Sequence, residues 1–138
     1  MSIGAGKWDG LGELRIVRVT LAPDRTATAA ARRVVEGACR AWHLDHVLET
    51  AQLVITELVS NVVRHAGTEM EISLTAHPGA LRLAVHDREP TTPQPAATGD
   101  TMAETGRGLL VIAALTSDWG ATPTDDGKVV WAVLSTNV

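Results

Sequence analysis

Thr56 to Gly67 reads TELVSNVVRHAG, and this stretch decides how the chain is interpreted. Its apolar residues recur with the spacing of an α-helix, and glycine is the residue that most often follows the end of one. The pattern predicts a helix that opens near Asp45 and continues to about Ala66, with Gly67 at its C′ position.

Polar residues form one stripe along this predicted helix. At about 100° per residue, Thr50, Asn61 and Arg64 fall within about 40° of Glu57. Most such stripes face water, and the periodicity alone favours that interpretation. The second interpretation is chemical. Side chains at i and i+4 project side by side, so Glu57 could act as a general base while the amide oxygen of Asn61 ligates Mg²⁺.

A pair of glycines offers the phosphate site that this chemistry needs. TGRGLL, residues 105–110, follows a long loop over 88–105 and opens a helix predicted over 106–115. The N–H groups at a helix N-terminus favour an anion, and glycines let a phosphate approach the backbone. A glycine turn without any ligand is the plainer alternative. The pattern is not a Walker P-loop, and no GxGxxG follows a strand as a Rossmann site requires.

Asp87 is the third polar feature, at the end of the apolar strand RLAVHD. Its carboxylate could accept a hydrogen bond from an exocyclic amine, a contact that distinguishes adenine from guanine. An aspartate that simply begins a loop is at least as common.

The remaining pattern predicts an α+β fold, a two-layer sandwich with a mixed, mostly antiparallel sheet and helices on one face. Residues 1–12 are rich in glycine and are predicted to be a flexible segment, and residues 13–138 form one domain. The other predicted elements are a strand over 13–21, a helix from the N-cap Asp24 to about Trp42, a hairpin over 69–87 turned at Pro78-Gly79, and a final strand pair turned at 125–127.

Composition narrows the class of function. A net charge of −4, no basic run, and no Phe or Tyr on which bases could stack argue against nucleic acid as a partner. No apolar run approaches the length of a membrane span, so no membrane partner is expected. Cys39 is the one cysteine, which suits a reducing compartment, and we expect a cytoplasmic protein.

Taken together and in this order, the three polar features resemble the motifs of the GHKL (Bergerat-fold) ATPases. ELVSN (57–61) is similar to the family's N-box, Asp87 to its G1 box, and GRGL (106–109) to its G2 box. The residue pattern of Thr56–Gly67 and the closing GKVVWAVL look most like those of the small anti-sigma-factor serine/threonine kinases and their actinobacterial relatives, the histidine-kinase-like ATP-binding proteins.

The resemblance implies a role for each matching residue. Glu57 would be the general base, Asn61 the Mg²⁺ ligand, and Asp87 the partner of the adenine amino group. The residues that would bind the phosphates of ATP are Gly106, Arg107, Gly108 and Leu109. Arg64 and His65 match the sequence motif of this branch, but no role is assigned to them.

The implied function is an ATP-dependent protein kinase that binds a sigma factor, an anti-sigma antagonist or both, and homodimerisation is implied with it. Glu89 stands where the G1 box usually has glycine, so a nucleotide-sensing interaction module without phosphotransfer remains the alternative. A detached catalytic domain of a histidine kinase ranks last, because no phosphoacceptor helix pair is present.

Overall fold

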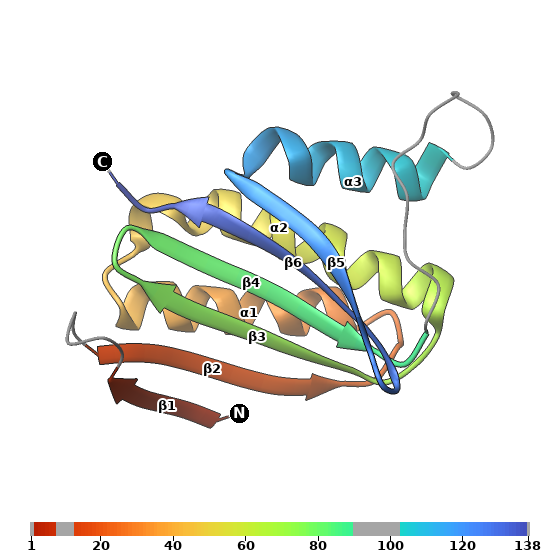
Figure 1. Ribbon diagram of the computed structural model, residues 1–138, viewed down its shortest axis with the longest axis horizontal. Helices are drawn as coiled ribbons and strands as arrows, with labels where there is room; N and C mark the ends of the chain where they lie inside the picture. The colour runs from red at the N-terminus through yellow and green to blue at the C-terminus, as the bar shows by residue number, and fades with distance from the viewer. Residues whose placement is uncertain (1, 8–12, 90–102, 138) are drawn as a thin grey trace.

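The computed structural model describes residues 2–7, 13–89 and 103–137 of this 138-residue chain (Figure 1). Most of the predicted loop over 88–105 therefore lies outside the described residues. The described elements, in chain order, are β1 (Ser2–Lys7), β2 (Glu13–Leu21), α1 (Ala27–Ala41), a 3₁₀ turn (Asp45–Val47), α2 (Leu48–Asn61), a π turn (Val62–Ala66), β3 (Met70–His77), β4 (Ala80–Asp87), α3 (Ala103–Leu115), β5 (Asp118–Thr124) and β6 (Gly127–Ser135).

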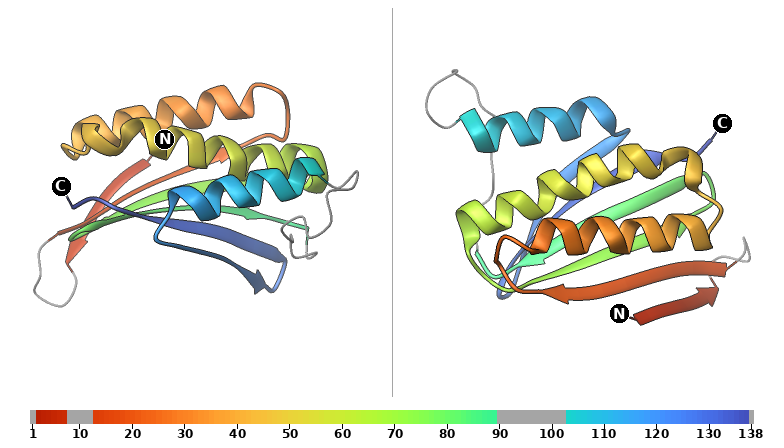
Figure 2. Two further views of the ribbon diagram at one scale, coloured as in Figure 1. Left: turned by 90° about the horizontal axis from the view of Figure 1, so that it is seen from above. Right: turned by 180° about the vertical axis from the view of Figure 1, so that it is seen from behind.

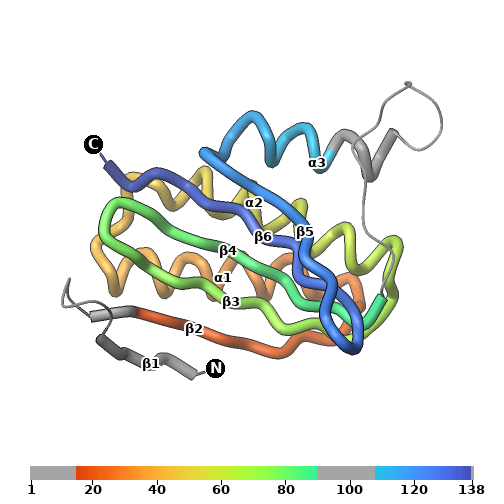
Figure 3. The backbone as a smooth tube through the Cα atoms, in the orientation of Figure 1, coloured from red at the N-terminus to blue at the C-terminus, as the bar shows by residue number. Residues whose placement is uncertain are grey.

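The described strands form one sheet in the order β1-β2-β3-β4-β6-β5, and each pairing among them is antiparallel. The helices α1, α2 and α3 all lie on the same side of this sheet (Figure 2). The two-layer α+β sandwich is therefore confirmed. The backbone trace places β4 beside β6 near the middle of the sheet, although α3 and β5 separate them in sequence (Figure 3).

The core lies between the sheet and the helices. Alternate strand residues such as Ile72, Leu83 and Ala132 are fully buried, which is the period of two that places one strand face on a core. Ile55 and Leu58 of α2 are buried against them, as the helical period predicts. Cys39 is also buried in this core, and burial raises the pKa of its thiol to about 11.

Two segments near the N-terminus differ from the predictions. Ser2–Lys7 lie in the segment predicted to be flexible, yet they pair with β2 as β1, because ladder hydrogen bonds use only backbone groups. Asp24 is not the N-cap of α1. Its carboxylate accepts the Thr26 N–H at 2.8 Å in an Asx turn, and α1 begins only at Ala27, with Thr26 at the N-cap.

The helix that carries Glu57 ends in a wider turn than an α-helix. Gly67 N–H donates to the carbonyl of Val62, five residues back, at 2.7 Å, and Gly67 has a φ of 62°. Glycine at the C′ position is thereby confirmed, since a side chain disfavours this left-handed conformation. The α-helical count of 100° per residue stops applying at Asn61, so it does not place Arg64.

Candidate functional site

Glu57 and Asn61 of α2 lie under α3 and do not form a simple solvated stripe. Both residues are only partly exposed, and α3 crosses α2 at Gly108. A Cβ atom on Gly108 would lie 2.7 Å from Oε2 of Glu57 and 3.6 Å from Oδ1 of Asn61. A larger residue at this position would therefore displace the Glu57 carboxylate, whereas the distance to Asn61 is an ordinary van der Waals contact.

The amide of Asn61 is buried and has no hydrogen-bond partner among the described residues. Neither its Oδ1 nor its Nδ2 atom makes a hydrogen bond with the residues that the structure describes, and both atoms are shielded from solvent. A buried amide without partners costs free energy, so native structures rarely keep one unless a ligand or a function uses it. This observation separates Asn61 from an ordinary surface residue.

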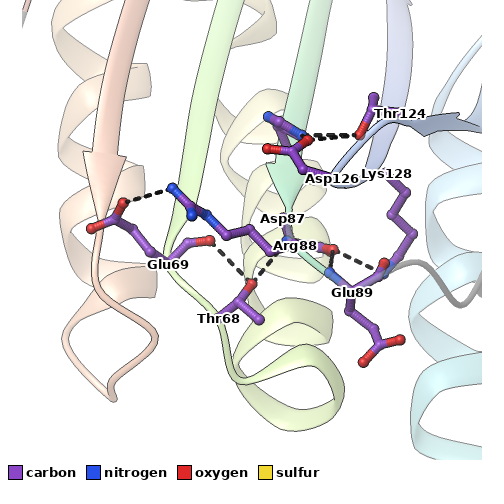
Figure 4. Close-up of polar contacts among 9 residues, drawn as sticks. Thr68, Glu69, Asp87, Arg88, Glu89, Thr124, Asp126 and Lys128 are labelled. Atoms are coloured by element: carbon purple, nitrogen blue, oxygen red, sulfur yellow. Dashed lines mark hydrogen bonds and ion pairs between the residues drawn. The ribbon is translucent and has the colours of Figure 1, made fainter.

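Asp87 ends β4 in a buried ion pair that the sequence did not predict. Its carboxylate is 2% exposed, and its Oδ1 accepts from Nζ of Lys128 at 3.0 Å and from the Glu89 N–H at 2.8 Å. Lys128 also donates to the Glu89 carbonyl at 2.8 Å. Figure 4 shows this closed network, with the Glu89 carboxylate pointing away from it.

Gly127 lets β6 approach the end of β4. A Cβ atom at this position would overlap the Asp87 carbonyl oxygen, at 1.9 Å, and would lie 2.6 Å from the Cα atom of Arg88. Because both contacts are to backbone, no side-chain movement could relieve them. The glycine therefore fixes Lys128, the next residue, opposite Asp87 in the ladder of β4 and β6.

Lys128 and Gly127 belong to the candidate site without having been predicted from the sequence, although a signal for Lys128 was present. Lys128 shares its strand phase with Val130, Ala132 and Leu134, all of which are buried. A lysine in the apolar phase of a strand needs a buried partner, since an unpaired ammonium is very costly to bury. The structure supplies that partner as Asp87, at the end of the neighbouring strand β4.

The remaining predicted residues are distributed differently. α3 begins at Ala103 rather than at Gly106, so Gly106 lies in its first turn and Gly108 beyond it. The side chain of Arg107 lies outside the described residues. Leu109 is fully buried and packs its side chain into the core.

Arg64 lies in the π turn that follows α2. It lines a hollow near the start of α1, together with Asp24, Arg25, Thr28, Ser60 and Val63. The predicted stripe is therefore divided, with Glu57 and Asn61 facing α3 and Arg64 beside α1.

The residues present fit a magnesium nucleotide. Mg²⁺ takes hard oxygen ligands and keeps several waters and phosphate oxygens, so the one amide oxygen of Asn61 suits it. The described residues contain no group of three or more His, Cys, Asp or Glu side chains that could hold a metal ion. The first N–H groups of α3, from Ala103 to Gly106, have no acceptor within the helix and favour an anion.

Within the described part of the chain, no helix has the length and apolarity needed to cross a membrane.

Comparison with solved structures shows the same fold in a bacterial protein. The chain superposes with a TM-score of 0.59 on the crystal structure of the RsbU and RsbW domains of Rv1364c from Mycobacterium tuberculosis, at 18% sequence identity. The match covers 87% of this chain and 31% of the other, so this chain spans about a third of that protein's length. A search of curated protein sequences gives no significant match.

Comparison with protein families gives a match over most of the chain. The family described as "Histidine kinase-like ATPase domain" matches residues 21–134, which include Glu57, Asn61, Asp87 and the start of α3. This chain therefore belongs to the histidine kinase-like ATPase domain family.

Proposed function

We propose that this protein is an ATP-binding regulatory protein and a serine/threonine kinase of the anti-sigma-factor type. One observation carries the proposal: Glu57 and Asn61 meet Gly108 of α3, and the Asn61 amide is buried with no partner among the described residues. In the proposed site Glu57 would be the base and Asn61 the ligand for Mg²⁺, and both side chains meet a glycine of a second helix in a chain of an ATPase family.

The chemistry follows from the positions of these side chains. Mg-ATP, when bound, supplies the transferable γ-phosphoryl group. Asn61 would hold Mg²⁺ through Oδ1, and the backbone of α3 from Gly106 to Leu109, with Arg107, would bind the phosphates. Glu57 would take the proton of the partner's hydroxyl as its oxygen bonds to phosphorus and the bond to the β–γ bridging oxygen breaks.

The acceptor would be the serine or threonine hydroxyl of a second protein, an anti-sigma antagonist, and a sigma factor would be the second partner. The fold shared with a chain that contains an RsbW domain supports a regulatory protein of this kind. We extend the proposal to a cytoplasmic homodimer that regulates transcription.

A nucleotide-sensing interaction module without phosphotransfer is the alternative, and Glu89 favours it. The backbone N–H and carbonyl of Glu89 are both tied into the Asp87–Lys128 network, so this segment is fixed where the family usually has a glycine. Both functions require ATP to bind, and they differ in whether Glu57 acts as a base.

Asn61→Ala tests the magnesium site. Wild-type protein is expected to bind ATP more tightly with Mg²⁺ than with EDTA, and the variant is expected to lose most of that difference, about tenfold or more, as metal sites do when a ligand shell is damaged. Isothermal titration calorimetry with ATP measures both affinities. Asn137→Ala makes the same chemical change in an exposed side chain and is expected to bind like wild type.

If the wild type binds no ATP at millimolar ligand, the proposed function fails. If Asn61→Ala keeps the full effect of Mg²⁺, Asn61 is not the ligand.

Gly108→Ala tests the contact between α3 and Glu57. The added methyl group would meet a carboxylate at the free end of a side chain, so the fold is expected to survive while the carboxylate is displaced. A displacement of about 1 Å lowers phosphoryl transfer by about 10²-fold. The measurement is transfer from γ-labelled ATP, alongside the thermal midpoint.

The matched control is Gly37→Ala in α1, where nothing lies within 4 Å of the added atom. Gly37→Ala is expected to leave transfer unchanged. A fully active Gly108→Ala protein would show that Glu57 needs no fixed position.

A further inference from the structure

Lys128 is the buried partner of Asp87, the residue that would meet a nucleotide base in the proposed function. Asp87 and Lys128 are direct partners in the ladder between β4 and β6, and both side chains point to the sheet face that the helices cover. Only 6% of Lys128 is exposed. A lysine is almost never buried unless it is paired, and Lys128 meets this condition through its ion pair with Asp87.

Among the described residues, the hydrogen bonds of the pair leave one donor and one acceptor without a partner. An ammonium carries three N–H donors. Two of those on Lys128 reach Oδ1 of Asp87 and the Glu89 carbonyl. On Asp87, the bonds from described residues both end on Oδ1, and Oδ2 receives neither of them. The pair thus presents one acceptor and one charged donor side by side.

This arrangement is complementary to the edge of adenine. Adenine carries an amino donor at N6 and, next to it, a ring acceptor at N1. A lone carboxylate reads only the amino group. A carboxylate beside an ammonium reads both positions, because each base atom then faces a group of the opposite hydrogen-bonding type.

We propose that Lys128 is a specificity-determining residue of the nucleotide site, which donates its third N–H to N1 of adenine while Oδ2 of Asp87 accepts from the N6 amino group. The proposal rests on the nucleotide site of the proposed function. Hypoxanthine presents the inverted pattern, with an acceptor at position 6 and a donor at N1. It would place an oxygen against the carboxylate and an N–H against the ammonium, so it is rejected at both points.

The backbone of Glu89 holds both members of the Asp87–Lys128 pair in this arrangement. Its carbonyl holds the Lys128 ammonium and its N–H holds Oδ1 of Asp87, so its backbone fixes the direction in which the pair faces. Glu89 is thus a positioning residue that acts through its backbone, with its carboxylate directed away from the pair (Figure 4).

The test compares ATP with 1-deaza-ATP, which has a carbon in place of N1 and keeps the N6 amino group. Wild-type protein is expected to bind ATP about 10- to 100-fold more tightly than 1-deaza-ATP, the range for one hydrogen bond to a charged group. Lys128→Met is expected to bind the two nucleotides equally, because neither base atom then has a donor to meet. Inosine triphosphate is expected to bind the wild type more weakly than either.

Arg88→Met is the matched control. Arg88 is the residue after Asp87, it is 65% exposed, and it lies 3.8 Å from Glu69 on the surface. Its replacement removes one positive charge from the same region and is expected to leave the ratio of ATP to 1-deaza-ATP affinity as in the wild type. If Lys128 were purely structural, Lys128→Met would lower the affinities for ATP and 1-deaza-ATP by the same factor. The wild type would then bind the two nucleotides with equal affinity.

Each outcome decides the question. Equal binding of ATP and 1-deaza-ATP by the wild type overturns the Lys128 contact and leaves the proposed function intact. No binding of ATP by the wild type overturns the proposed function and the contact with it. The comparison of the two nucleotides in the wild type needs no variant, so a Lys128→Met protein that fails to fold does not prevent the test.

Discussion

Replacing Glu57 by glutamine is expected to slow phosphoryl transfer by about 10²–10⁴-fold, the usual contribution of a general base. Glutamine keeps the shape of the side chain next to Gly108 and removes only the ability to take a proton. ATP affinity is therefore expected to stay near the wild-type value. The rate is measured under single-turnover conditions with γ-labelled ATP, as label on a partner protein and as released phosphate.

Glu49→Gln is the matched control, since Glu49 is an exposed residue in the first turn of the same helix. It is expected to transfer phosphate at the wild-type rate. If Glu57→Gln is as active as Glu49→Gln, Glu57 is not the base. If wild-type protein binds ATP and transfers nothing, the sensing module replaces the kinase.

Replacing Asp87 by alanine is expected to lower the free energy of unfolding by about 3–5 kcal/mol, the range for a buried ion pair that loses one partner. The Lys128 ammonium would keep the Glu89 carbonyl and lose its counter-ion in a site that water barely reaches. ATP binding is expected to be lost as well. Guanidinium unfolding followed by circular dichroism measures the stability.

The double variant Asp87→Ala with Lys128→Met is expected to regain most of the lost stability, because no buried charge then remains. Glu36→Ala removes one partner of the exposed pair with Arg40, whose charged groups lie 3.1 Å apart. It is expected to cost no more than about 1 kcal/mol. A loss of that small size in Asp87→Ala would show that the buried pair does not hold the end of β4.

Much of the candidate site can be predicted from local sequence. The pairing of Glu57 with Asn61 is predicted because residues at i and i+4 of a helix share a face, which depends only on helical geometry. Asp87 is a candidate because it ends an apolar strand. The sequence predicts the start of α3 three residues late, at Gly106, because glycine often marks a helix boundary, although Ala103, Glu104 and Thr105 are compatible with a helix.

The spatial contacts among these residues could not be predicted from local sequence. The periodicity of α2 could not distinguish a stripe that faces water from one that faces another helix, since both give the same pattern. The structure decided this by placing Gly108 against Glu57 and Asn61. Similarly, Lys128 follows the apolar phase of its strand, but the sequence does not state which acidic residue lies across the ladder.

The sequence by itself determined the helix of Glu57, its glycine end, the turn at Gly79 and the three motifs of the family. These features depend on periodicity and on the backbone angles that glycine permits, and both are properties of short segments. Only the tertiary structure decided that the Asn61 amide is buried without a partner among the described residues, and that Asp87 meets a lysine 41 positions away. Those properties arise when the sheet order brings β4 beside β6 and α3 onto α2, and no local pattern contains that information.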